Sequence, residues 1–281
     1  MRFLVTGGLG FIGTATIKKL ERDHDVSSFD IKAGEDILDL NMLESAFKRS
    51  QPEVVFHFAA RTSVVESIHQ PFAYAETNIL GTINVIEQCR KSGAKLIYAS
   101  SGGTVYGEGK VPFRETDPAR PFSPYGISKY TGELLVNDFH EERVILRYAN
   151  VYGPDQSGEG ESGVISKYIQ RVLNNVKPII RGDGRQTRDY IYIDDVVDAN
   201  LMALKWKGTY NISTGISTSV LDLYKELEDT MNYKGGYDVV DSMGELEHVS
   251  LSCEKAKSLG WRAMVSLSEG IGKTVEHVSQ G

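Results

Sequence analysis

Short apolar runs alternate with helical stretches through the first half of the chain, and this alternation constrains the fold more than any other feature. Each run is apolar on both sides of the pleat, as strands of a parallel sheet are when helices cover both of its faces. The pattern therefore predicts an α/β fold with a doubly wound parallel sheet and right-handed crossovers. The expected strands are Phe3–Val5, Val26–Phe29, Val54–Phe58, Lys95–Ala99 and Val144–Leu146, and the expected helices cover about 11–22, 41–49, 72–92 and 124–141.

The alternation loosens after Gly153, where a glycine-rich stretch is typical of a flexible loop. We expect a main domain over residues 1–153 and a smaller C-terminal substrate-binding lobe over 154–281, with segments at about 179–212 returning to the main domain. A cleft between the two is the natural place for a substrate. In this part the expected helices lie near 163–175, 194–205 and 218–230, and the expected strands near 179–181, 190–193, 209–212 and 237–240.

Composition excludes several classes of protein. The net charge of −7 argues against nucleic acid or an acidic membrane as the main partner. No run of roughly 18 apolar residues is present, so no transmembrane helix is expected, and the first residues enter a strand without a signal peptide. The two cysteines, Cys89 and Cys253, lack metal-type spacing. We therefore expect no metal site and a reducing compartment, the cytoplasm.

The first expected strand runs directly into three glycines, Gly7, Gly10 and Gly13, and a helix is expected to follow them. The first glycine permits a tight turn, the second lets the backbone approach a pyrophosphate, and the third allows close packing of helix on strand. Phe11 and Ile12, at the start of that helix, would also meet the pyrophosphate, because a helix N-terminus presents free N–H groups. The arrangement predicts a Rossmann-type dinucleotide site. The alternative is a tight turn with no ligand.

A carboxylate closes the second expected strand, about 20 residues beyond the glycines, where it can accept hydrogen bonds from the adenosine ribose. This residue, Asp30, would repel a 2′-phosphate, so NAD is favoured over NADP. Lys32 weakens that preference, because a cation could bind a phosphate. Ile31 would border the same site, and Asp36 with Ile37 could cover the adenine. A role of Asp36 in helix entry is the alternative.

Tyr125 and Lys129 lie four residues apart in an expected helix, which places both side chains on one face. A phenol normally ionises near pH 10, and a cation one turn away favours the phenolate. The pair is thus a candidate general base for the oxidation of an alcohol. The alternative is an exposed surface pair.

Several motifs, in their order and spacing, resemble the extended short-chain dehydrogenase/reductases, and within them the nucleotide-sugar epimerases and dehydratases. The resemblance extends from residue 3 to about residue 198. The matching segments are Gly7–Gly13, His57–Ala60, Asn78–Thr82, Ser100–Gly107, Tyr125–Lys129, Arg147–Pro154 and Gly182–Tyr190.

The resemblance implies a role for each matching position. Tyr125 would be the catalytic base, and Lys129 its partner and a ligand of the nicotinamide ribose. Asn78 would steady the central helix, His57 would be structural, and Tyr106 would be a packing residue. The remaining residues expected to line NAD are Phe58, Ala59, Ala60, Asn78, Ala99, Ser100, Tyr148 and Val151.

The resemblance also implies a nucleotide-diphosphate sugar as the substrate. Asn150 resembles the asparagine of the family that contacts the substrate, and Arg188 the arginine that grips the diphosphate. The alternative for Arg188 is a pair with Asp189 or Asp195. The other residues expected at the substrate are Ser101, Gly102, Val164 and Tyr125.

The chain departs from the family pattern beside the tyrosine. Gly102 stands where the family has a serine or threonine, and we expect Ser101 to supply the hydroxyl instead. Gly103 and Thr104 stand where the dehydratases have an acid–base pair, so 4,6-dehydration is disfavoured. Decarboxylases often have a glutamate at the Thr104 position, so decarboxylation is disfavoured as well.

A second departure concerns the diphosphate. The run Ser242–Glu245 lacks the arginine that the family often has there, and Arg181, Arg185 or Arg262 could replace it. Arg61, after the two alanines, could contact a phosphate or face solvent.

The expected function is NAD-dependent 4-epimerisation of a nucleotide-linked hexose, such as UDP-glucose and UDP-galactose, by transient oxidation at C4. Lys129 and the positive nicotinamide would keep the pKa of Tyr125 low. The alternatives are another nucleotide-sugar oxidoreductase, dehydratase or decarboxylase of the family, and a non-catalytic NAD-binding sensor or scaffold. A homodimer is expected through the helices at 72–92 and 124–141. Tyr74, Ile83, Ile86, Leu134 and Val136 would lie either in that interface or in the core.

Overall fold

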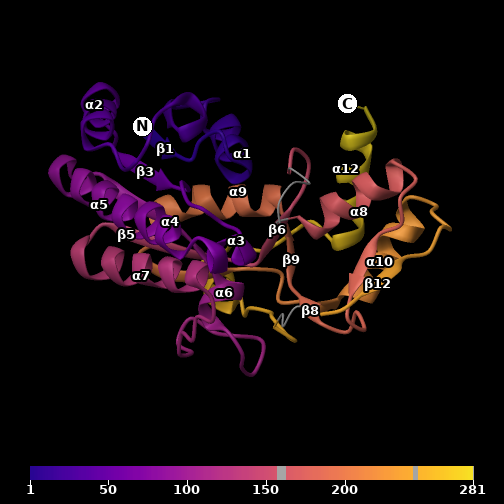
Figure 1. Cartoon of the computed structure of the whole chain (residues 1–281). Coiled ribbons are helices and arrows are strands. Elements are labelled where there is room, and N and C mark those ends of the chain that lie inside the picture. The colour runs from indigo at the N-terminus through magenta and orange to yellow at the C-terminus, as the bar shows by residue number, and fades with distance from the viewer. Residues whose placement is uncertain (157–162, 243–245, 281) are drawn as a thin grey trace. The chain divides into compact units, whose positions relative to one another are not determined.

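A computed structural model of the chain describes residues 1–156, 163–242 and 246–280 (Figure 1). It separates into two compact units. The segment 106–120, expected in the main domain, groups with the second unit, and Val197–Tyr210 is the late stretch that groups with the first. The division into a cofactor domain and a substrate domain stays a prediction. Unit 1 comprises Met1–Val105, Pro121–Tyr148 and Val197–Tyr210, and unit 2 comprises Tyr106–Arg120, Ala149–Val196 and the residues from Asn211 onward.

Unit 1 is built on a six-stranded sheet with the order β10-β5-β4-β3-β1-β2. The pairs among β1 to β5 are all parallel, which confirms the predicted doubly wound sheet. The order reverses between β1 and β3, and ligands of such sheets bind beyond the carboxyl ends of the strands at that point. The strands are β1 (Arg2–Thr6), β2 (Asp25–Phe29), β3 (Val54–His57), β4 (Lys95–Ser101), β5 (Arg143–Tyr148) and β10 (Gly208–Ile212).

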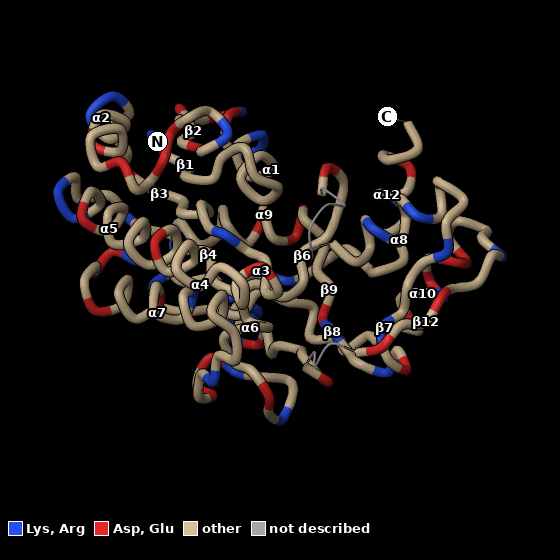
Figure 2. The backbone as a smooth tube through the Cα atoms, in the orientation of Figure 1, with Lys and Arg blue, Asp and Glu red and all other residues tan. Residues whose placement is uncertain are grey.

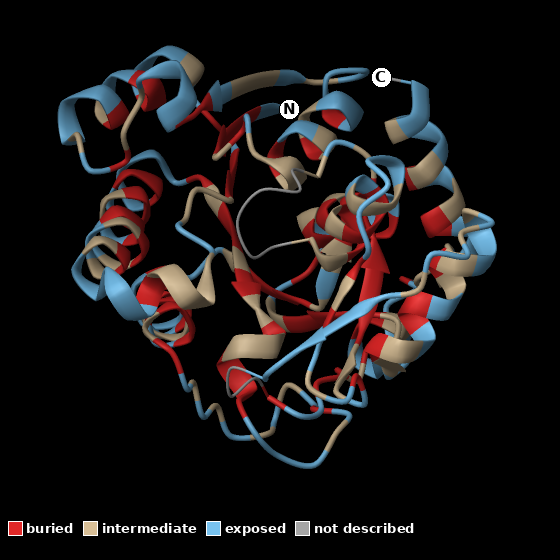
Figure 3. Ribbon diagram, turned by 45° about the vertical axis from the view of Figure 1, so that its right-hand side comes forward, coloured by how far each residue is buried: buried red, intermediate tan, exposed pale blue. Residues whose placement is uncertain are grey.

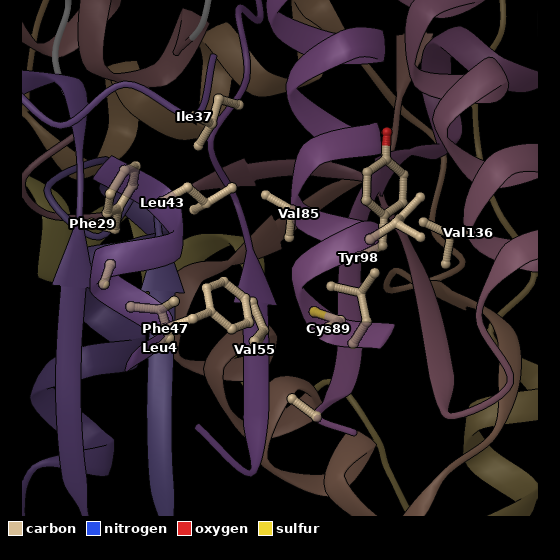
Figure 4. Packing of buried hydrophobic residues seen from close by; sticks show 14 of the residues in the cluster. Leu4, Phe29, Ile37, Leu43, Phe47, Val55, Val85, Cys89, Tyr98 and Val136 are labelled. Atoms are coloured by element: carbon tan, nitrogen blue, oxygen red, sulfur yellow. The ribbon is translucent and has the colours of Figure 1, made fainter. Parts of the chain in front are cut away.

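One face of this sheet carries a continuous apolar core (Figure 4). Alternate strand residues such as Leu4 and Val55 point to this face, and Val85 and Val136 meet them from the helices α5 and α7. On the other face Phe3 stacks on Phe56, with ring centroids 6.0 Å apart. The helices of this unit are α1 (Phe11–Leu20), η1 (Ile31–Ala33), α2 (Leu40–Ser50), α3 (Val64–His69), α4 (Pro71–Ala75), η2 (Glu76–Leu80), α5 (Gly81–Ser92), α7 (Pro124–Phe139) and η3 (Ala203–Lys205).

The helix predicted over 72–92 is interrupted. A π-helical turn, η2, separates α4 from α5. Asn78 lies in this turn, and its side-chain amide bonds the backbone of Arg61. π-Helical turns occur often at functional sites, because the extra residue re-aims a side chain. A sequence pattern of period 3.6 does not reveal such an insertion.

Unit 2 contains three two-stranded sheets: β6 pairs with β9, β8 with β11, and β7 with β12. The sequence patterns did not predict β6, β8, β11, α6, α11 or α12, nor α3 in unit 1. Most of these elements are short, and tertiary packing rather than periodicity defines such segments. The elements that lie in this unit or reach into it are α6 (Gly102–Tyr106), β6 (Asn150–Tyr152), α8 (Val164–Leu173), β7 (Ile179–Arg181), β8 (Thr187–Arg188), β9 (Tyr190–Tyr192), α9 (Ile193–Met202), β11 (Thr218–Ser219), α10 (Val220–Thr230), β12 (Asp238–Val240), α11 (Glu254–Ser258) and α12 (Leu267–Gln280).

The central strands are buried, whereas the helices are buried along one side only (Figure 3). Both α2 and α5 carry an acidic residue followed by two basic residues in the last turn (Figure 2). Within the described ranges, no helix combines the length and the apolar character needed to cross a membrane.

Candidate active site

The glycine turn after β1 has no room for side chains. Gly7 has φ +72°, and a Cβ there would lie 2.5 Å from the backbone nitrogen of Ala59, at the end of β3. A Cβ on Gly13 would lie 2.1 Å from the carbonyl oxygen of Gly7. Both contacts are shorter than van der Waals packing permits, so these positions require glycine.

The remaining glycine of the turn, Gly10, is needed for a different reason. A Cβ on Gly10 would meet only the carbonyl oxygen of Gly7, at 3.2 Å, so the space above it is open to a ligand. Gly10 is the N-cap of α1 and offers no side-chain cap, and the first turn of that helix has no acidic residue. Phe11 and Ile12 begin the helix, where N–H groups have no partner in their own helix. This cradle fits the pyrophosphate of a dinucleotide.

Asp30, which directly follows β2, is 5% exposed and is oriented by backbone groups on both sides. Its Oδ2 accepts from Leu9 N at 2.9 Å and its Oδ1 from Lys32 N at 2.8 Å. The amine of Lys32 donates to the carbonyl of Leu9 at 3.0 Å, so it is tied to the glycine turn. A carboxylate held in this way can accept ribose hydroxyls, whereas its charge disfavours a 2′-phosphate.

Three neighbours of Asp30 were also expected at the cofactor. Ile31 is 66% exposed beside it. Asp36 accepts from Leu38 N at 2.9 Å and so organises its own turn. Ile37 is 4% exposed and belongs to the apolar core, where it packs against Gly81. Contact of these residues with the adenine stays a prediction.

Tyr125 lies in the first turn of α7, which Ser123 caps by accepting from Gly126 N at 3.1 Å. The phenol is 9% exposed, and burial raises its pKa to about 12. The side chain of Ser101, at the end of β4, opposes this shift and acts to lower the pKa of the phenol. The structure therefore brings together the tyrosine and the serine that the sequence offered in place of Gly102.

Lys129 is one turn further along the same helix and 4% exposed. Its amine lies 4.3 Å from the centre of the Tyr98 ring. Burial lowers the pKa of Lys129 to about 7, and the negative charge of Glu133 opposes this shift. In the protein alone, burial prevails in the pKa of Tyr125. The expectation that Lys129 and the positive nicotinamide together keep this pKa low stays a prediction.

Asn78 clamps the loop that follows β3. Its Oδ1 accepts from Arg61 N at 2.8 Å, and its Nδ2 donates to Arg61 O at 3.0 Å and to Ser128 Oγ at 2.9 Å. Ser128 Oγ in turn donates to the backbone carbonyl of Tyr125 at 2.8 Å. The clamp links the loop carrying Ala60 to the helix α7. Its amide is occupied by protein groups, which supports the steadying role.

The hydroxyls of two residues expected to line NAD are occupied within the protein. Ser100 donates to the carboxylate of Glu133, and Tyr148 donates to Asn200 Oδ1 at 2.7 Å. Phe58 stacks on Phe56, with ring centroids 5.6 Å apart. Ala59 and Ala60, which follow β3, and Ala99, which lies within β4, are half-buried. Their contribution to a cofactor pocket stays a prediction.

His57 is a buried structural histidine, as expected. Its Nδ1 lies 2.7 Å from Thr6 Oγ1 and its Nε2 lies 3.0 Å from Thr82 Oγ1. Burial, with a smaller contribution from Lys129, lowers its pKa to about 3, so the ring is neutral at physiological pH.

In unit 2, Tyr106 is fully buried and packs as expected, with its ring 4.9 Å from that of Phe113. Its hydroxyl donates to Asn211 Oδ1 at 2.9 Å.

The expected substrate residues of unit 2 lie on neighbouring elements. Asn150 is exposed on β6, next to Val151, and its backbone N–H donates to Asp189 O at 2.9 Å. Val164 begins α8. Arg188 is half-buried on β8 and donates to Thr187 O at 2.8 Å.

The alternative for Arg188 was a pair with an aspartate. The carboxylate of Asp189 accepts from Thr214 Oγ1 at 2.7 Å and from Gly215 N at 3.0 Å, so backbone and hydroxyl donors already hold it. The substrate role of Arg188 stays a prediction.

The run Ser242–Glu245 stands where the family often has an arginine for the diphosphate. Its residues 243–245 lie outside the described residues. Of the candidate replacements, Arg185 is 84% exposed, and its Nε lies 3.7 Å from Asp183 Oδ2.

Comparison with known proteins decides the family. Residues 3–213 match the model of the NAD dependent epimerase/dehydratase family. The chain belongs to this family. That result confirms the resemblance, the enzyme class and NAD as the cofactor.

Individual members of the epimerase/dehydratase family match almost the full chain. A UDP-glucose 4-epimerase of Mycolicibacterium smegmatis is 36% identical over 98% of both sequences. A Thermotoga maritima UDP-glucose 4-epimerase, solved with UDP-glucose, has a TM-score of 0.96 and 38% identity, covering 100% of this chain and 99% of its own. A Thermus thermophilus UDP-glucose 4-epimerase, solved with NAD, has a TM-score of 0.92 and 35% identity over 99% of both chains.

Two residues of the site were missed in the sequence. Glu133 is four residues beyond Lys129 and shares its helix face, and Arg147 pairs with it from β5. The spacing after Lys129 was a usable signal for Glu133. Only the fold brings Arg147 to it.

Proposed function

We propose that this chain catalyses the NAD-dependent interconversion of UDP-glucose and UDP-galactose by transient oxidation at C4 of the hexose. The observation that carries the proposal is the burial of Tyr125 and Lys129 one turn apart on α7, with Ser101 acting to lower the pKa of the phenol. Family membership and the UDP-glucose found with a structural neighbour support the choice of substrate.

Tyr125 takes the proton from the 4-hydroxyl of the sugar. Ser101 donates to the phenolic oxygen and so favours the phenolate, because a hydrogen bond to the charged form lowers a pKa. When bound, oxidised NAD supplies the hydride acceptor for C4 and a positive ring that favours the phenolate further. The protonated tyrosine then returns its proton to the oxygen of the 4-keto sugar from the same position.

Inversion at C4 requires the sugar to present both of its faces to the cofactor in turn, which depends on how the substrate is held. The 4-keto sugar must turn about its diphosphate linkage to accept hydride on the opposite face. Arg188 is the proposed diphosphate ligand, since a guanidinium binds phosphate in a bidentate manner. Asn150 and Val164 complete the proposed contacts of unit 2.

The short helix α6, which follows Ser101, favours epimerisation over dehydration. Loss of water from C5 and C6 needs a general acid and a general base, and Gly103 and Thr104 provide neither. The product therefore keeps its 6-hydroxyl.

The decisive experiment incubates the purified chain with NAD and separately with UDP-glucose, UDP-galactose, and dTDP- and GDP-hexoses. We expect UDP-galactose to form from UDP-glucose, and the reverse, without net NADH. Stoichiometric NADH would indicate a net dehydrogenase. Absence of any 4-epimer from the whole panel would refute the proposal.

A homodimer is the proposed assembly. Tyr74, Ile86 and Val136 are buried in unit 1, whereas Ile83 and Leu134 are 40% and 46% exposed. The packed helices α5 and α7 thus present apolar side chains that a second copy would cover. Other exposed apolar residues of α4, η2 and α7 are Phe72, Leu80, Ile127 and Phe139. A dimer by light scattering, and a monomer for Ile83→Glu/Leu134→Glu, is the expected result.

A cytoplasmic location is the proposed compartment. Cys89 and Cys253 are both free thiols and both buried. Unpaired cysteines are typical of reducing surroundings.

A further inference from the structure

A buried ionic cluster lies along α7 beyond the catalytic pair. Glu133 is 3% exposed, and its carboxylate receives Arg147 Nε at 2.9 Å and Nη2 at 2.6 Å. The hydroxyl of Ser100 on β4 donates to the same carboxylate. Three donors from two strands therefore hold the carboxylate in place.

The same helix face carries the catalytic residues. Lys129 precedes Glu133 by four residues, and Tyr125 precedes it by eight, so the three side chains follow one side of α7. Tyr98 of β4 lies against this face: its ring is 4.3 Å from the lysine amine and its hydroxyl donates to Lys129 O at 3.2 Å. The negative charge of Glu133 acts on Lys129 in opposition to burial.

The other titratable groups around Lys129 keep one charge state over the physiological range. His57 on β3 has its pKa lowered to about 3 by burial, and Tyr98 has its pKa raised well above 10 by burial. Tyr125 has its pKa raised to about 12. Arg147 stays charged. Between pH 5 and pH 9, Lys129 is thus the group of this cluster that changes its protonation.

We propose that Glu133 is a positioning residue of the reaction, whose buried charge, oriented by Arg147 and Ser100, keeps the amine of Lys129 protonated beside Tyr125. The pair of Glu133 with Arg147 would be an unfavourable way to fill a core, since well-packed apolar residues are often as stable as a buried ion pair. A role in setting the charge of Lys129 explains why the pair of Glu133 and Arg147 lies on this face of α7. The catalytic meaning of this inference rests on the proposed function.

The first test needs neither cofactor nor sugar. The free energy of unfolding is measured from pH 5 to pH 9 for the chain and for Lys129→Met, and the difference between the two is plotted. Because burial lowers the pKa of Lys129 to about 7 in the folded state, from 10.5, the unfolded chain binds more protons above pH 7. The difference is flat at low pH and rises in favour of the lysine from about pH 7.

The decisive experiment repeats this comparison, with and without Lys129→Met, in the Glu133→Gln variant. We expect the rise to begin at least about one pH unit lower, as is typical when an opposite charge is removed. An unchanged onset would overturn the proposal and leave Glu133 as a structural partner of Arg147. Glu133→Asp, which keeps the charge, should restore most of the onset.

Removal of Glu133 alone takes the carboxylate partner away from the buried Arg147, which can prevent folding. Glu133→Gln/Arg147→Met removes both charges and should show the same lowered onset, since the charge that acts on Lys129 is that of Glu133. The matched control is Glu87→Gln, which breaks an exposed pair with Arg90 at 3.0 Å and should leave the onset unchanged.

A second readout is the pH profile of kcat for UDP-glucose epimerisation. Its alkaline limb should move to lower pH by about one unit in Glu133→Gln, because the lysine loses its proton earlier. A moved onset in the folding experiment with no epimerase activity would refute the proposed function and retain the electrostatic role of Glu133. Epimerase activity with an unmoved onset would retain the proposed function and refute the electrostatic role of Glu133.

Discussion

The two sites on the first unit are built in different ways. The glycine cradle after β1 consists of backbone: Gly7 and Gly13 leave no space for a Cβ, and Gly10 leaves space for a ligand. The site at the end of β4 consists of side chains, with Ser101 from the strand and Tyr125 and Lys129 from α7.

The difference concerns how each site binds charge. The cradle uses N–H groups that a helix end leaves free, so it needs no ionisable residue. The second site keeps a phenol and an amine away from water, and burial shifts the pKa of each toward its neutral form. The cradle is therefore sensitive to volume, and the catalytic site to charge and hydrogen bonding.

The largest expected effect separates chemistry from binding. Tyr125→Phe removes the group that exchanges a proton with the sugar, and kcat should fall by about 10²–10⁴-fold. NAD affinity, measured by calorimetry, should stay within a few fold, because the cradle is untouched. A variant with full kcat would exclude Tyr125 as the base.

The next effect tests the residue that replaces the usual hydroxyl. Ser101→Ala removes a donor to the phenolic oxygen, worth about 1.5–3 kcal/mol toward a charged acceptor. We expect kcat to fall by about 10–100-fold. Ser101→Thr, which keeps the donor, is the control. Equal loss in both variants would indicate a packing effect instead.

A change of volume should damage the cradle. Gly13→Ala places a Cβ 2.1 Å from Gly7 O, and overpacking of this kind costs about 1–3 kcal/mol of unfolding free energy. NAD affinity should fall with it, since the turn must shift. Gly272→Ala, where a Cβ meets nothing within 4 Å, should be neutral or slightly stabilising. Thermal unfolding of both variants, with and without NAD, measures the contrast.

The smallest expected effect is at the adenosine end. Asp30→Asn weakens the acceptor for the ribose, and NAD affinity should fall by about 5–10-fold, in line with about 1 kcal/mol for one hydrogen bond. The preference for NAD over NADP should narrow, because the charge that repels a 2′-phosphate is gone. An unchanged preference would assign the selection of NAD to another residue.

The fold followed from periodicity where elements were long and apolar. The parallel strands β1 to β5 and the helices α1, α2 and α7 lie within a few residues of their predicted bounds. The prediction failed for the π-helical turn at Asn78, because that turn is stabilised by bonds to Arg61 and Ser128, distant in sequence. It also failed for short segments such as α6, where local pattern carries little information.

Among the candidate site residues, the roles of the glycines were the easiest to predict, because the absence of a side chain is known from the sequence alone. Ser100 shows the opposite case. The sequence suggested a residue lining the cofactor, whereas the fold directs its hydroxyl to Glu133. Which way a serine points depends on neighbours from other strands.

The sequence by itself determined the doubly wound sheet, the glycine turn after β1 and the spacing of Tyr125 and Lys129, since each depends on residues close together in the chain. The tertiary structure alone decided that Ser101 reaches the phenol and that Arg147 and Ser100 hold Glu133 behind Lys129. It also decided that burial, and not the lysine, dominates the phenol pKa. Periodicity and spacing predict local interactions, whereas charge states depend on burial, which exists only once the chain has folded.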